Sequence, residues 1–185
     1  MKTLQRTLGV FVITILMNTL SFGAMAATEK DLQKDASQAL EILTKTDPVA
    51  KAIAKKARAT LIFPSIVKAG LIFGGAYGEG LLQKDGKVDG DYNSVTASWG
   101  LQAGAQSYGY IVFLMSDSAI KYIKETKGWE IGVGPTVVLV DEGVAKNLST
   151  SSLKDDAYAY IFDQSGVMAG VSIEGTKITH IKNSK

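Results

Sequence analysis

A glycine-rich apolar stretch, residues 60–82, places the strongest constraint on the fold. Its only charged residues are Lys68 and Glu79, and it carries five glycines: Gly70, Gly74, Gly75, Gly78 and Gly80. Read with a period of two from Leu71, one face of the stretch is bulky and the other is nearly bare. Glycine weakens a strand unless the strand bends or another backbone approaches it closely. The stretch therefore predicts one central, curved strand with another backbone packed close to it.

Residues 1–26 have the three parts of a secretory signal peptide. A basic start, with Lys2 and Arg6, is followed by an apolar run and by an Ala-Met-Ala cleavage pattern. The apolar run is shorter than the roughly 20 residues of a membrane-spanning helix, which favours a signal peptide over a membrane anchor. Cleavage is expected before Ala27. Residues 27–185 then form one domain in the periplasm, with secretion beyond it as the other destination.

Composition excludes several kinds of function. The chain is 46% hydrophobic and 21% charged, as in an ordinary globular protein. Removing Lys2 and Arg6 with the leader lowers the 20 Lys and Arg residues to 18, equal to the 18 Asp and Glu residues, so the charge gives no reason to expect nucleic acid. Without cysteine there are no disulfides and no thiol metal site. His180 is the only histidine, and we expect neither a metal nor a cofactor.

The order of the predicted elements indicates the fold class. Helices are predicted from residue 29 to 45 behind the N-cap Thr28, from Asp47-Pro48 to about Arg58, and from residue 117 to 126 behind Ser116. Period-two patterns predict further strands over 92–100, 101–115 and 129–140, tight turns at 84–87 and 89–91, a turn-rich segment over 141–154, and a three-strand meander over 157–163, 167–174 and 177–182. Helices first, then mostly strands with one inserted helix, predict an α+β domain with a curved, mostly antiparallel, barrel-like sheet.

Four blocks of the sequence resemble the SYLF-domain family. In family order they are LIFPSIVKAGLIFGGAYGEG, SWGLQAGAQSYGYIVFLMS, GPTVVLV and AYAYIFDQSGVMAGVSIEGTKI, and the likeness extends from about residue 32 to 182. Eukaryotic SYLF proteins bind phosphoinositide membranes through a basic, amphipathic N-terminal segment, and some in yeast also bind actin. Many bacterial members are exported envelope proteins. The resemblance implies a non-enzymatic lipid-binding domain.

Lys51, Lys55, Lys56 and Arg58 lie where that family has its basic lipid-binding segment. In a continuous helix Lys51, Lys55 and Arg58 share a face. Basic side chains near an anionic membrane contribute about 1 kcal/mol each. The apolar side of this helix is mostly alanine, and the expected compartment offers no actin and little phosphoinositide, so we predict anionic phospholipid as the partner and no actin. A solvated face without a ligand is the other interpretation.

Two further functions stay open. The apolar faces of a curved sheet could enclose a lipid or small apolar ligand, which would make the protein a carrier. Glu79, in an apolar strand, could serve a hydrolase-like enzyme as acid or base, although a surface or hydrogen-bonded position is the simpler expectation. Residues 75–80 lack the spacing and the following helix of a dinucleotide site. We therefore predict no catalytic residue.

Overall fold

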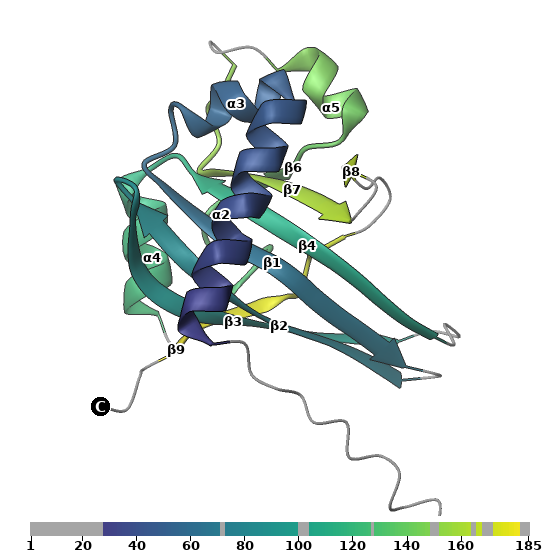
Figure 1. The fold of residues 1–185 in the computed structure, drawn as a ribbon. Helices are drawn as coiled ribbons and strands as arrows, with labels where there is room; N and C mark the ends of the chain where they lie inside the picture. Colours follow the sequence, from purple (N-terminus) through teal and green to yellow (C-terminus); the bar gives the residue numbers. More distant parts are fainter. Residues whose placement is uncertain are drawn as a thin grey trace, which may run out of the picture.

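The computed structural model describes residues 28–70, 73–99, 104–126, 128–148, 152–163, 166–167 and 172–181. The signal peptide predicted over residues 1–26 lies outside them. Helices α2 (Glu29–Thr46) and α3 (Pro48–Ala54) come first, and α4 (Asp117–Glu125) lies between strands (Figure 1). The rest is a curled sheet, which confirms the α+β prediction.

The described strands form one nine-stranded sheet. They are β1 (Ala59–Gly70), β2 (Phe73–Lys84), β3 (Lys87–Trp99), β4 (Gly104–Leu114), β5 (Trp129–Glu130), β6 (Val137–Leu139), β7 (Ala157–Asp163), β8 (Gly166–Val167) and β9 (Lys177–Ile181). Their order is β5-β9-β3-β2-β1-β4-β7-β6, with β8 paired to β7. Only the β6–β7 pair is parallel, so the sheet is mostly antiparallel, as predicted.

The prediction of one central strand over residues 60–82 is wrong. This stretch forms two antiparallel strands, β1 and β2, which pair as far as Gly70 and Gly74 and lie at the centre of the sheet. The close approach of a second backbone is confirmed. A Cβ atom built on Gly78 or Gly80 would lie 2.4 Å from a carbonyl oxygen of β1. Pro64 is accommodated inside β1 because the register with β2 shifts between Ile62 and Val67.

Two local predictions also differ from the structure. Residues 89–91 were expected to form a turn, but they lie inside β3, where Gly90 takes a φ of +146°. The segment expected to be turn-rich contains a short helix, α5 (Glu142–Asn147), whose first turn is capped by the Asp141 carboxylate. In both places a local turn signal was overridden, by strand pairing in one case and by a helix cap in the other.

The predicted C-terminal meander is wrong as well. Strand β7 pairs with β4 near one edge of the sheet, whereas β9 pairs with β3 and β5 near the other edge. The described part of the predicted strand over 167–174 is extended only at its start, in β8. The C-terminal segment therefore contributes strands near both edges of the curled sheet instead of forming three neighbouring strands.

Hydrophobic clusters cover both faces of the sheet. Helices α2 and α3 pack on one face over Ile62, Leu81 and Phe113. Helix α4 packs on the other face, with Trp129 and Tyr110 in its cluster. Figure 1 shows α2 lying across the strands and α4 on the opposite side. This arrangement fixes the position of α3, which contains Lys51 and ends just before the other predicted lipid-binding residues.

Candidate functional site

Helix α2 holds the site in place. Leu32, Ala36 and Leu43 are buried against the sheet, and the Thr28 side chain accepts a hydrogen bond from the Asp31 amide at the first turn. The predicted start of this helix is confirmed.

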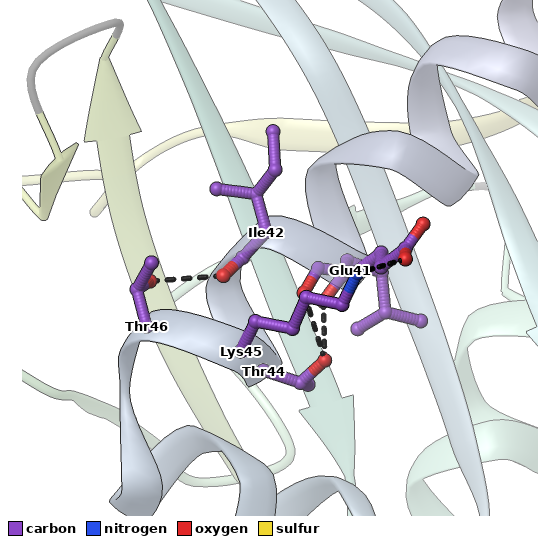
Figure 2. Close-up of polar contacts among 6 residues, drawn as sticks. Glu41, Ile42, Thr44, Lys45 and Thr46 are labelled. Atoms are coloured by element: carbon purple, nitrogen blue, oxygen red, sulfur yellow. Dashed lines mark hydrogen bonds and ion pairs between the residues drawn. The ribbon is translucent and has the colours of Figure 1, made fainter.

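The last turn of α2 is closed by its own side chains (Figure 2). The Thr44 hydroxyl donates to the Leu40 carbonyl at 2.8 Å, and the Thr46 hydroxyl donates to the Ile42 carbonyl at 2.9 Å. These are back-bonds from threonine hydroxyls to carbonyls one turn earlier, and they give the hydroxyls partners within the helix. Lys45 forms an exposed ion pair with Glu41 one turn earlier.

Helix α3 begins where predicted and ends early. Asp47 Oδ1 accepts hydrogen bonds from the amides of Val49 and Ala50, at 2.7 and 2.9 Å. Ala50 and Ile53 are fully buried, so Lys51, on the other side of the helix, faces solvent. The helix was predicted to run to Arg58, but it ends at Ala54.

The end of α3 places the four basic residues in two settings. Lys51, Lys55 and Lys56 are exposed at the helix end. The Arg58 amide already donates to the Leu114 carbonyl at 2.8 Å, beside the start of β1, so Arg58 does not share a helical face with Lys51. Its guanidinium lies 2.8 Å from Asp117 Oδ2, at the N-terminus of α4. The sequence analysis missed Asp117, because nothing in the local pattern links residues 59 positions apart.

The electrostatics of this region favour an anion. From Pro48 to Gly78 the sequence has five basic residues and no acidic residue: Lys51, Lys55, Lys56, Arg58 and Lys68. Within the part of the chain that the structure describes, neither Lys51 nor Lys55 forms an ion pair. We call Lys51, Lys55, Lys56 and Arg58 the basic segment. None of the described helices is both long enough and apolar enough to span a bilayer.

The groups considered for catalysis are not assembled into a site. The Tyr77 hydroxyl donates to Glu79 Oε1 at 2.9 Å, and burial, together with this contact, raises the pKa of Tyr77. Glu79 is thus a hydrogen-bonded carboxylate, as the simpler expectation had it. His180 is exposed at the edge of the sheet, with its ring centroid 5.1 Å from that of Tyr92. Among the described residues there is no cluster of three potential metal ligands.

The face of the sheet that α4 covers is filled by side chains where it is described. Phe63 and Tyr110 stack with centroids 4.7 Å apart, and Trp129 and Ile173 are buried in the same cluster. Burial also raises the pKa of Tyr110, as expected for a phenol without solvent. This packing gives the carrier hypothesis no support.

Comparison with known families identifies the second half of the chain. Residues 95–184 match the model of the family described as "Ysc84: Las17-binding protein actin regulator". This match makes these residues similar to the SYLF family. The SYLF match confirms the resemblance, over a shorter range than the blocks quoted above, and it leaves out α2, α3 and the basic segment. SYLF domains are binding domains with lipid- or actin-related roles at the level of the family. No curated protein matches the chain.

Proposed function

We propose that this protein is an exported envelope protein that binds anionic phospholipid through the basic segment. The observation that carries the proposal is the group of exposed lysines at the end of α3, which extends from a helix anchored by buried Ala50 and Ile53. The lipid-related role of the SYLF family supports it. The periplasm is the compartment we propose, and a protein purified from the envelope with Ala27 as its first residue would support export.

Binding of this kind is mainly electrostatic. Each lysine near an anionic surface contributes about 1 kcal/mol, so Lys51 and Lys55 together contribute about 2 kcal/mol. The alanine-rich helix offers little apolar surface for insertion. Arg58 should contribute less than a lysine, because Asp117 already pairs with it. Screening over about 8 Å at physiological ionic strength makes the interaction sensitive to salt.

The test is co-sedimentation with vesicles of graded phosphatidylglycerol content at low and high salt. We expect binding that rises with anionic lipid and falls with salt. The variant with Lys51→Glu, Lys55→Glu and Lys56→Glu should lose binding and keep the circular dichroism spectrum of the parent, because all three side chains are exposed. Phosphatidylcholine vesicles should bind neither protein.

A matched control separates the site from the net charge. Lys30→Glu, Lys34→Glu and Lys121→Glu change the charge by the same amount at exposed positions of α2 and α4. This control variant should retain most of the vesicle binding. Equal binding by the parent and the basic-segment variant would rule out the mechanism, and equal losses in both variants would reduce it to a general charge effect.

A further inference from the structure

Three exposed apolar side chains lie in one line across the sheet. Val67 pairs with Tyr77, and Tyr77 pairs with Val95, so the three side chains are cross-strand neighbours on β1, β2 and β3. They are 56%, 50% and 47% exposed. Isolated exposed apolar residues are normal, but residues aligned in register form a continuous patch. We call this line the apolar ridge.

A row of small residues runs beside the apolar ridge. Ala69 pairs with Gly75, and Gly75 pairs with Ala97, two residues further along each strand. Side chains two apart on a strand share a face, so this small-residue row lies next to the ridge, and all three residues are exposed. A Cβ atom on Gly75 would meet only the Thr96 carbonyl oxygen at 3.6 Å, so packing within the chain does not require glycine there.

The face that carries the ridge is left open by the helices. Tyr77 and Leu81 lie four residues apart on β2, so their side chains point to the same face of the sheet. Leu81 packs in the cluster of α2, so α2 covers this face near the basic segment and leaves it open at the ridge. In Figure 1 the strands β1 to β4 extend well beyond α2. The sequence has no charged residue from Ser94 to Ser116. The ridge is flanked on β2 by the hydrogen-bonded Glu79, and it ends beside the exposed Lys177 of β9, which pairs with Val95.

We propose that this face binds the same face of a second copy of the chain. A two-fold axis running across the strands, between the apolar ridge and the small-residue row, places each large side chain over a small one. Tyr77 then lies over Gly75 of the second copy, Val67 over Ala69 and Val95 over Ala97. A two-fold interface must be complementary to itself, and a ridge beside a row of small residues meets that condition. Sheets stacked in this way lie about 10 Å apart.

Tyr77 is the expected centre of the interface. Tyrosine is enriched among residues that dominate interface energies, because it buries a large rigid ring while its hydroxyl stays paired. Here the hydroxyl already donates to Glu79, so it keeps a hydrogen-bond partner when the ring is buried in a dimer. The proposal is independent of lipid binding, because the apolar ridge and the basic segment share no residue.

Light scattering and sedimentation velocity over a concentration series test the proposal on protein purified from cells that express the full chain. We expect a reversible dimer. Val95→Lys places a charge on the ridge in both copies and should weaken association at least about tenfold. Val88→Lys is the matched control, since Val88 lies on the same strand, is 40% exposed and is outside the ridge. It should leave the dimer unchanged.

Cross-linking tests the geometry, because the chain has no cysteine of its own. A mixture of the Val95→Cys and Ala97→Cys proteins should form covalent dimers with a short bis-maleimide, whereas a mixture of Val88→Cys and Ala97→Cys should not. A monomer at every concentration, or a dimer insensitive to Val95→Lys, would overturn the proposal. So would a monomer in which Val95→Lys lowers vesicle binding, which would assign the face to lipid.

Discussion

Two buried tyrosines in the hydrophobic cluster on the α4 face differ in how their hydroxyl groups are satisfied. Tyr110 donates to Ser94 Oγ at 2.8 Å, and both side chains are buried. The Tyr92 hydroxyl is also buried but has no hydrogen-bond partner among the described residues. Burial, with the negative charge of Asp89 adding to it, raises the pKa of Tyr92 to about 12. The sequence could not predict which of the two hydroxyls would find a partner.

Paired substitutions should separate the two tyrosines. Tyr110→Phe leaves Ser94 without its donor and should lower the free energy of unfolding by about 1–2 kcal/mol. Tyr92→Phe removes an unpaired buried hydroxyl, so its free energy of unfolding should rise or change by less than about 0.5 kcal/mol. Urea denaturation of both variants measures this difference. Equal losses would mean that Tyr92 has a partner outside the described residues.

At the scale of elements, the helix starts were predictable because their signals are local. Thr28, Asp47 and Ser116 each accept a hydrogen bond from an amide in the first turn, as their side chains and positions indicated. The end of α3 was not predictable. Alanine and lysine continue past Ala54 and favour a helix, but the Arg58 amide bonds to the Leu114 carbonyl instead. Pairing of β1 with β4 thus overrides helix propensity, and it moves Arg58 away from Lys51.

The contact between β1 and β2 should depend on glycine at one position and not at another. Gly80→Ala would place a methyl group 2.4 Å from the Ile62 carbonyl oxygen and against the Phe63 ring, so it should destabilise the protein by about 1–3 kcal/mol or more. Gly75→Ala, on the same strand with open space around it, should change stability by less than about 1 kcal/mol. Thermal unfolding of both variants compares them, and similar costs would contradict the close approach.

The basic segment illustrates the same limit for the candidate site. The lysines were visible in the sequence as a charge cluster, and the structure leaves Lys51, Lys55 and Lys56 exposed as expected. The ion pair of Arg58 with Asp117 and the alignment of Val67, Tyr77 and Val95 depend on strand register. The register depends on how several strands pair with one another, so it cannot be predicted from the sequence of any one strand.

At the scale of the whole molecule, one sheet serves two hydrophobic clusters. Neighbouring residues of one strand point to opposite faces, as Leu61 and Ile62 do on β1, and belong to different clusters. If the sheet unfolds, both clusters lose the surface on which they pack. The helices on one face and Trp129 on the opposite face should therefore unfold together.

Two optical probes test this coupling. In a Trp99→Phe background, fluorescence reports Trp129 on the α4 side, while far-ultraviolet circular dichroism is dominated by α2. We expect the two urea transitions to coincide, as for a single cooperative unit. A lower midpoint for the circular dichroism signal would mean that α2 detaches before the sheet unfolds.

The position of β9 determines when a growing chain can complete its fold. This strand ends at Ile181, yet it pairs with β3, and the bond between Thr96 and Thr176 spans 80 positions of sequence. A chain synthesised from its N-terminus has β1 to β4 long before it has β9, so the outer side of β3 lacks this partner until residues 177–181 have been synthesised. Long-range pairings of this kind form late and slowly. The nascent polypeptide consequently exposes unpaired backbone groups along one side of β3 until β9 has been synthesised, and the sheet is completed only after that step.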